Sequence, residues 1–171
     1  MAVRKMNGIR GSVKGAPPLW TFHEAELDRA DVRHLLALHF AEMRADSPPE
    51  ACHVLPIDGL RSPAIRFFSL RDAGGSLLGI GALKLLDSRH GEIKSMRTAP
   101  AALCLGVGSA MLDHLTATAR ALGLTRISLE TGKSPLFAAA NRLYQRDGFQ
   151  RCGPFGDYPD TPFTAFYTRE L

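Results

Sequence analysis

Two glycines near the middle of the chain, Gly106 and Gly108, lie where a loop is expected to pass into a helix. Glycine lets the backbone turn sharply and lets a ligand come close to it. The free N–H groups at the start of a helix, together with the helix dipole, favour a bound phosphate. A Gly-x-Gly sequence on its own is also compatible with a tight strand-to-helix turn that holds no ligand. The loop therefore indicates a phosphate site or an ordinary turn, and its surroundings decide between them.

The residues on either side of this loop predict the elements that would hold it in place. Residues 91–98 are expected to form a strand. After the loop, apolar residues recur at helical spacing, namely Met111, Leu112, Leu115, Ala119 and Leu122. They predict an amphipathic helix from about residue 108 to 122, which Gly123 is placed to end. The chain therefore contains a β-loop-α unit with the two glycines at the N-terminus of its helix.

The rest of the chain predicts an α+β domain. Further strands are expected at residues 20–26, 65–71, 77–86 and 125–131, with two more between 150 and 171. Helices are expected from Asp31 to a break at Ser47-Pro48-Pro49, and from Ser134 to about Arg146. Residues 50–62 are predicted to form a short helix or a loop. Because no repeat and no linker divides the chain, residues 19–171 are predicted to form a single domain.

The net charge of +4 is concentrated at one end of the chain. Residues 1–18 hold Arg4, Lys5, Arg10 and Lys14 and no acidic residue. The 21 basic residues less these four leave 17, which equals the 17 acidic residues, so the domain itself has no basic bias. The charge therefore argues against a nucleic-acid partner. We expect residues 1–18 to be a disordered basic arm or an extension.

The composition, with 45% hydrophobic and 22% charged residues, is typical of a soluble globular protein. No apolar run approaches the roughly 18–20 residues of a membrane span, and no apolar stretch follows the basic N-terminus as in a secretory signal. Cys52, Cys104 and Cys152 lack the spacing of metal ligands, and the six histidines form no paired-ligand motif. We therefore expect a cytoplasmic protein with free thiols, no metal site and no membrane partner.

The chain resembles the GNAT superfamily of N-acetyltransferases in two motifs. The segment from Leu103 to Gly108 resembles motif A, in which a strand is followed by Gln/Arg-x-x-Gly-x-Gly/Ala, and residues 143–149 resemble motif B, Leu-Tyr-x-x-x-Gly-Phe. Residues 91–100 and 152–158 also look like an uncharacterised bacterial subgroup of this family. The resemblance spans residues 20–171. It implies a GNAT-like fold, a central mixed, mostly antiparallel sheet of about 6–7 strands flanked by about four helices.

The resemblance also implies acetyl-CoA as cosubstrate. The backbone of Met96 would donate to the thioester oxygen, and the backbones of Arg97 and Thr98 would pair with the pantetheine arm. The pyrophosphate would lie on Leu103, Cys104, Leu105, Gly106, Val107, Gly108 and Ser109. Leu103 departs from the usual Gln or Arg, Cys104 and Leu105 replace a frequent Gly and Lys, and Phe137 replaces a frequent Asn. Since most pyrophosphate contacts in the family come from backbone N–H groups, we expect weaker CoA binding than the family norm, not its absence.

Two side chains are candidates for proton transfer. Glu92 lies fourteen residues before Gly106, the spacing seen in GNAT histone acetyltransferases, where such a glutamate acts as a base directly or through water. It could instead be a solvated glutamate paired with Lys94. Tyr144 matches the tyrosine of motif B, which lies near the CoA sulfur in the family. A phenol with a pKa of roughly 10 is protonated at neutral pH and can protonate a thiolate. The alternative is a helix tyrosine packed against the sheet.

The acceptor site is expected between residues 43–61 and 153–164, with Phe155, Tyr158 and Phe163 as candidate walls. Arg151 is either an anchor for an anionic group or a surface arginine. The sequence thus predicts transfer of an acetyl group from acetyl-CoA to a primary amine of a small molecule or peptide, by direct attack in a ternary complex. A CoA-binding protein of the same fold with little transferase activity is the alternative, because Leu103 removes a polar side chain. A homodimer is left open.

Overall fold

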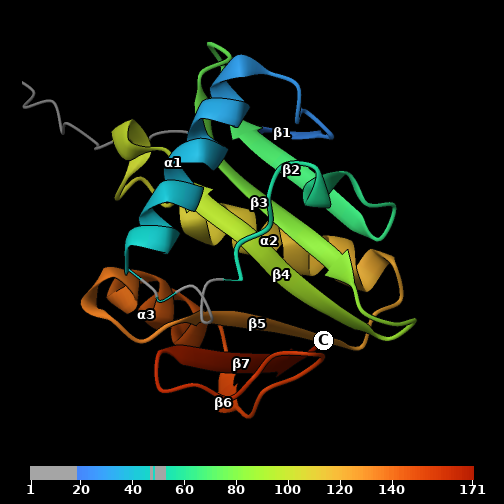
Figure 1. The fold of residues 1–171 in the computed structure, drawn as a ribbon. Helices are drawn as coiled ribbons and strands as arrows, with labels where there is room; N and C mark the ends of the chain where they lie inside the picture. Colours follow the sequence, from blue (N-terminus) through green and yellow to red (C-terminus); the bar gives the residue numbers. More distant parts are fainter. Residues whose placement is uncertain (1–18, 47, 49–52) are drawn as a thin grey trace, which may run out of the picture.

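The computed structural model describes residues 19–46, 48 and 53–171 (Figure 1). The arm predicted for residues 1–18 and the thiol of Cys52 lie outside the described residues. The described chain forms one mixed sheet with three α-helices. The strands are β1 (Thr21–Glu24), β2 (Ile65–Arg71), β3 (Leu77–Leu85), β4 (His90–Thr98), β5 (Arg126–Gly132), β6 (Gln150–Cys152) and β7 (Thr164–Glu170). The helices are α1 (Ala30–Asp46), α2 (Val107–Ala121) and α3 (Ala138–Arg146).

The predicted fold class is confirmed, with one difference in the helices. The described residues hold three α-helices where about four were predicted. Three short 3₁₀ turns accompany them, at Gly59–Arg61, Pro100–Ala102 and Pro135–Phe137. The segment predicted as a short helix or loop therefore contributes only a 3₁₀ turn in its described part.

The strand order is β1-β2-β3-β4-β5-β7-β6, and every neighbouring pair is antiparallel except β4 and β5. Helix α2 makes the crossover that a parallel pair requires. The two parallel strands pair only from His90↔Arg126 to Ile93↔Leu129. Beyond these residues they separate, as Figure 1 shows for the strand ends near α3. The sheet therefore opens between its two central strands.

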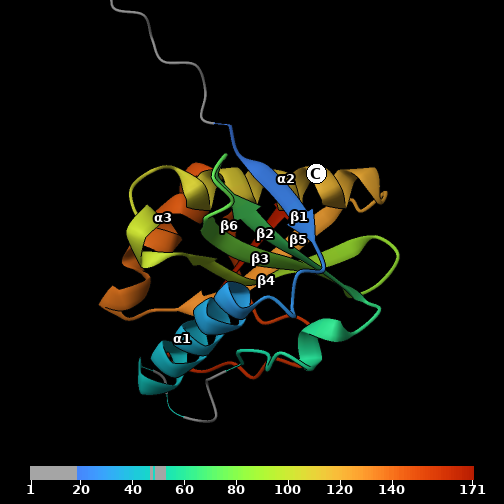
Figure 2. The ribbon, with the colours of Figure 1, turned by 90° about the horizontal axis from the view of Figure 1, so that it is seen from above.

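Helices α1 and α2 cover opposite faces of the sheet (Figure 2). Helix α2 buries Met111, Leu112 and Leu115, as its apolar stripe predicts. Gly81 on β3 allows α2 this close approach, because a Cβ there would lie 2.8 Å from the Met111 Cγ. Leu122, which the stripe included, is 42% exposed because the helix already ends at Ala121.

On the other face, α1 packs through Val32, Leu35 and Leu36 around Ile80 and Ala82 of β3. This packing matters for function because α1 also carries residues that reach the gap between β4 and β5. Among the described helices, none combines the length and hydropathy needed to cross a bilayer.

An ion-pair cluster fixes the start of α1 on the sheet. The guanidinium of Arg71, only 4% exposed, contacts Asp31 at 2.6 Å and Glu26 at 2.8 Å. The hydrogen bond from Arg71 lowers the pKa of Asp31 from 3.8 to about 2. Because the folded-state pKa lies below the unfolded value, the pair stabilises the protein above about pH 4, and this contribution is lost as the pH falls through about 2.

We expect Arg71→Met to lower the free energy of unfolding by about 2–3 kcal/mol at pH 7, because it leaves two partly buried carboxylates without their cation. The matched control is Arg66→Met, which removes an arginine paired with Glu24 at 2.7 Å where both side chains are more than one-third exposed. That pair should contribute less than about 1 kcal/mol. Urea denaturation of both variants is the measurement, and equal losses would contradict the structural role of Arg71.

Candidate active site

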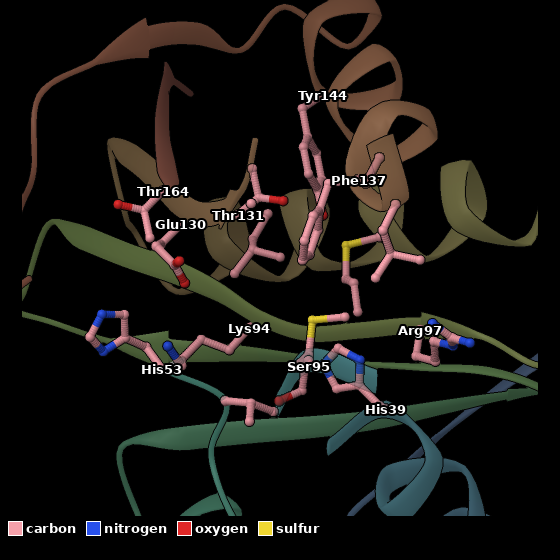
Figure 3. Close-up of a pocket in the computed structure, with 17 residues that line it drawn as sticks. His39, His53, Lys94, Ser95, Arg97, Glu130, Thr131, Phe137, Tyr144 and Thr164 are labelled. Atoms are coloured by element: carbon pink, nitrogen blue, oxygen red, sulfur yellow. The ribbon is translucent and has the colours of Figure 1, made fainter. Parts of the chain in front are cut away.

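A cleft opens where β4 and β5 separate, and its cavity volume is about 180 Å³ (Figure 3). Strand β4 contributes five consecutive residues, 93–97, and β5 contributes residues 130–132. Segments far apart in the sequence complete the wall, namely His39, Met43, His53, Val54, Leu136, Phe137, Ala140, Tyr144 and Thr164. The opening in the sheet is therefore a lined cleft rather than a packing defect.

Strand β4 carries a bulge close to where it leaves β5. Its register with β3 shifts between Ile80 and Ala82, and Ser95 has a left-handed φ of 52°. A bulge bends a strand and re-aims its residues. In the register of the described strands, Lys94, Arg97 and Thr98 pair with β3, and Ser95 and Met96 lie in the bulge between them. None of these five residues pairs with β5, so this edge of β4 faces the gap. Met96, Arg97 and Thr98, the predicted backbone donors, lie in this stretch.

The predicted phosphate loop leads into α2 at the same end of β4. Gly106 has a φ of +87°, and a Cβ there would meet nothing within 4 Å. Leu103 and Leu105 are each 59% exposed, and Cys104 is exposed as well. The expected strand-to-helix turn is thus present, with its glycine in an open position at the helix start. An open backbone at the N-terminus of a fifteen-residue helix fits a pyrophosphate group.

A cation that the sequence motifs did not single out also reaches this loop. The guanidinium of Arg146, on α3, donates to the Ser109 hydroxyl at 2.8 Å. Ser109 lies in the first turn of α2, so Arg146 brings positive charge to the helix start where Leu103 brings none. Arg146 occupies one of the variable positions of Leu-Tyr-x-x-x-Gly-Phe, so the motif does not mark it. Its role becomes visible only from the packing of α3 beside α2.

Glu92 lies below the cleft rather than in its wall. Its side chain is 1% exposed and is not among the residues that line the cavity. The ammonium of Lys94 donates to the Glu92 Oε1 at 3.0 Å, and the hydroxyl of Tyr158 donates to the same oxygen. Lys94 also donates to Tyr158. The pairing with Lys94 that the sequence left as the alternative is therefore present, but Glu92 is buried rather than solvated. The role of Glu92 as a base stays a prediction.

Glu130 is the carboxylate that does line the cleft, and sequence reasoning missed it. It follows Leu129, the last β5 residue paired with β4. Burial raises its pKa to about 7, the charge of Lys94 opposes this shift, and the charge of Glu92 adds to it. No hydrogen bond from a described side chain contributes to the shift. Strand alternation puts Glu130 on the opposite face of β5 from the buried Ile127 and Leu129, but nothing in the sequence pattern marks that face as the wall of a cleft.

Tyr144 lines the cleft and is also packed. Its side chain is 8% exposed, and its ring lies 6.0 Å from the Phe149 ring and 6.3 Å from the Tyr167 ring. Burial raises the pKa of Tyr144 to about 12, with Glu130 adding to the shift. The phenol is therefore protonated at neutral pH, and Figure 3 shows Tyr144 and Glu130 on the same side of the cleft. The packing that the sequence left as the alternative is therefore present, and the role of Tyr144 as the acid stays a prediction.

The opposite side of the cleft is polar and contains two neutral histidines. Burial lowers the pKa of His39 to about 4, and burial also lowers the pKa of His53. Arg97 pairs with Glu42 of α1 at 2.6 Å. Within the part of the chain that the structure describes, the buried His39 Nδ1, Ser95 Oγ and Arg97 Nε have no hydrogen-bond partner. A ligand in the cleft could satisfy such atoms.

The expected aromatic walls of the acceptor site are not part of the cavity lining. Phe155 packs against the rings of His90 and Phe166, and Phe163 is 49% exposed. Tyr158 contacts two residues of the lining, Lys94 through a hydrogen bond and His53 through an edge-to-face ring contact with ring centres 5.0 Å apart. The guanidinium of Arg151 lies over the Tyr167 ring, 5.1 Å from its centre. The cleft instead takes Met43, His53 and Val54 from the predicted segment 43–61 and Thr164 from the end of segment 153–164.

Comparisons with known proteins agree with this arrangement. The family model "Acetyltransferase (GNAT) family" matches residues 29–149. The uncharacterised N-acetyltransferase YedL of Escherichia coli is 44% identical over 90% of this chain and 96% of its own length. The uncharacterised N-acetyltransferase YsnE of Bacillus subtilis is 44% identical over 85% of this chain and 96% of its own length.

Solved structures show the same fold. A crystal structure described as a putative acyl-CoA N-acyltransferase from Klebsiella pneumoniae has a TM-score of 0.73 and 25% identity, covering 90% of this chain and 98% of the other. A GNAT acetyltransferase from Elizabethkingia anophelis with acetyl-CoA bound has a TM-score of 0.66 and 18% identity, covering 89% and 98%. The chain belongs to the GNAT family of acetyltransferases, as its two motifs predicted.

Proposed function

We propose that this protein transfers the acetyl group of acetyl-CoA to a primary amine of a small molecule or peptide, in the cytoplasm and by direct attack within a ternary complex. The observation that supports this most is the cleft itself. It brings Glu130, Tyr144 and the β4 residues 96–97 together, and β4 continues to Thr98, whose hydroxyl lies 3.9 Å from a Cβ built at Gly108 in the first turn of α2. Family membership makes acetyl-CoA the expected donor.

In this proposal the donor is held mainly by backbone groups. Residues 103–109 and the start of α2 bind the pyrophosphate, with Arg146 supplying the charge that Leu103 does not. The edge of β4 from Met96 to Thr98 pairs with the pantetheine arm. When bound, acetyl-CoA supplies an acyl carbon that is activated as a thioester. The N–H of Met96 can donate to the carbonyl oxygen as that oxygen gains negative charge.

Glu130 is the base that the geometry favours. An amine attacks only after its ammonium has lost a proton, and a carboxylate in the cleft with a pKa of about 7 suits that transfer at neutral pH. Glu92, the base predicted from spacing, would need a relay to the amine, because its side chain is 1% exposed and does not line the cleft, and Lys94 and Tyr158 both donate to its Oε1. Tyr144 is the proposed acid, since its phenol lines the cleft and is protonated.

The proposed reaction balances in atoms and charge. The C–N bond to the acetyl carbon forms and the C–S bond of the thioester breaks. The ammonium loses two protons in becoming an amide, the first of them to Glu130. The leaving thiolate gains one proton from Tyr144, and Tyr144 then takes up a proton again. One proton therefore reaches solvent for each acetyl group transferred.

The described residues include no group of three or more His, Cys, Asp or Glu side chains placed to hold a metal ion.

The experiment that tests the donor site replaces one glycine. We expect Gly106→Val to lower the affinity for acetyl-CoA by at least about tenfold, because a branched side chain would occupy the open position at the helix start. Gly123→Val is the matched control. Gly123 ends the same helix with a φ of +79° and also has nothing within 4 Å of a Cβ. Calorimetric titration with acetyl-CoA compares the two, and equal affinity of both folded variants would contradict the proposed donor site.

The alternative function is a CoA-binding protein with little transferase activity. It predicts the same binding result but no release of free CoA thiol when amines are added. The assay therefore pairs the titration with thiol detection over a panel of amines. Amine-dependent thiol release supports the transferase, and saturable acetyl-CoA binding without such release supports the alternative.

A further inference from the structure

The cleft presents a cation and an anion side by side. The parallel pairing between β4 and β5 ends at Ile93 and Leu129. Lys94 follows Ile93 on β4, and Glu130 follows Leu129 on β5. Both side chains line the cavity, and Figure 3 shows them on facing sides at the same end of it, with His53 beside Lys94. The charge of Lys94 acts on Glu130. A ligand at this end of the cleft therefore contacts both charges.

Lys94 keeps one donor for such a ligand. Its side chain is 8% exposed, and its ammonium donates to the Glu92 Oε1 and to the Tyr158 hydroxyl. An ammonium has three N–H groups. Among the described residues the third has no protein acceptor, while Lys94 lines the cavity. The buried His53 Nε2 also lacks a partner among these residues and faces the same cavity.

We infer that the acceptor is a small amino acid-type zwitterion, whose ammonium lies on Glu130 and whose carboxylate lies on Lys94 and His53. This inference rests on the proposed function and names the substrate class for it. The neutral imidazole of His53 can donate from Nε2 to the same carboxylate.

Charge explains why neither a simple amine nor a simple acid fits as well. A simple amine can pair with Glu130, but it leaves the third N–H of Lys94 and the His53 Nε2 without partners. A carboxylate without an ammonium is repelled by Glu130 and by Glu92. A zwitterion adds no net charge to the cleft and gives each charge a partner. The cavity volume of about 180 Å³, below the roughly 300–1,000 Å³ of pockets for drug-sized ligands, also favours a small acceptor over a folded protein.

The test compares pairs of acceptors that differ only at the carboxylate. Thiol release from acetyl-CoA is measured with a panel of α-amino acids, their carboxamides and simple alkylamines. We expect the amino acids to exceed their carboxamides by about 10–100-fold in kcat/KM, the range for a hydrogen bond to a charged group. The amine of a carboxamide is less basic than that of the amino acid, so it loses its proton more easily and should react faster on this ground alone. A higher kcat/KM for the amino acid would therefore have to overcome this difference.

Variants then assign the effect to Lys94. Lys94→Gln should reduce the preference for amino acids over carboxamides to less than about threefold, because it removes the cation and keeps a donor. Lys133→Gln is the control, since Lys133 is an exposed lysine just beyond β5 that does not line the cavity. It should leave the preference unchanged. If Lys94→Gln does not fold, the comparison of acceptors on the parent protein still decides the substrate class.

The outcomes separate the two proposals. Carboxamides or alkylamines acetylated as well as amino acids would overturn this inference and leave the proposed function in place. No thiol release with any acceptor in the panel would overturn the proposed function, and the inference with it. A folded Lys94→Gln variant that keeps the full preference would overturn the assignment of the carboxylate to Lys94.

Discussion

Glu130→Gln lowers kcat for acetyl transfer by about 10²-fold or more, whereas Glu92→Gln lowers it by less than about tenfold. This difference is expected because Glu130 lines the cleft and Glu92 is 1% exposed, with Lys94 and Tyr158 on one of its oxygens. The two variants are matched in chemistry, since each replaces a carboxylate on a central strand with its amide. Steady-state rates at saturating acetyl-CoA and amine are the measurement.

The pH profile provides a second readout of the same assignment. A base must be ionised to accept a proton, so kcat in the parent should rise with pH through about 7, the pKa to which burial raises Glu130. Glu130→Gln should lose this step, and Glu92→Gln should keep it, shifted downward because the charge of Glu92 helps to raise the pKa of Glu130. If Glu92→Gln instead loses the activity and the step while Glu130→Gln keeps both, the base is the one predicted from sequence spacing.

Tyr144→Phe is expected to lower kcat by about 10²-fold and to leave the melting temperature nearly unchanged, because it removes the proton donor and keeps the ring that packs against Phe149 and Tyr167. Tyr167→Phe is the matched control. Tyr167 is 2% exposed in the same core, and its hydroxyl accepts a hydrogen bond from Gln145 at 3.3 Å. It does not line the cleft. Rates near the parent value for Tyr144→Phe would remove it as the acid.

The effect of Tyr144→Phe should depend on the leaving group and not on the acceptor. Its role is to protonate a thiolate, so amines of high and low pKa should lose activity to a similar extent. Glu130→Gln should behave differently, because a weakly basic amine is already deprotonated and partly replaces the missing base. Equal rescue of both variants by weakly basic amines would contradict the division of roles.

The sequence predicted the elements of the fold well where periodicity and glycines act locally. The stripe of Met111, Leu112 and Leu115 identified α2, and Gly106 marked the turn before it. Leu122 was predicted to belong to the apolar stripe, but it is the C-cap residue of α2 and its side chain is 42% exposed, although its N–H still bonds to the Thr118 carbonyl. Local patterns therefore predicted the elements around the proposed donor site, including the open turn.

The acceptor side could not be predicted in the same way, because it depends on contacts between distant segments. Glu92 lies fourteen residues before Gly106 as expected, but Tyr158, sixty-six positions further on, fills the space beside it. Glu130 becomes accessible only because β4 leaves β5 after Ile93. A strand pattern shows which face a residue points to, and it does not show where a sheet opens. The separation of the two carboxylates into a buried one and a cleft-lining one is therefore a tertiary property.

The central claim is that an amine takes the acetyl group directly from acetyl-CoA within one complex. The most direct test is the initial rate of thiol release over a grid of acetyl-CoA and amine concentrations, with the amino acid acceptor that gives the highest rate. We predict that release requires the amine and that double-reciprocal plots at different fixed amine concentrations intersect. Parallel lines would indicate an acetylated enzyme, with exposed Cys104 as the first residue to examine, and would contradict direct attack.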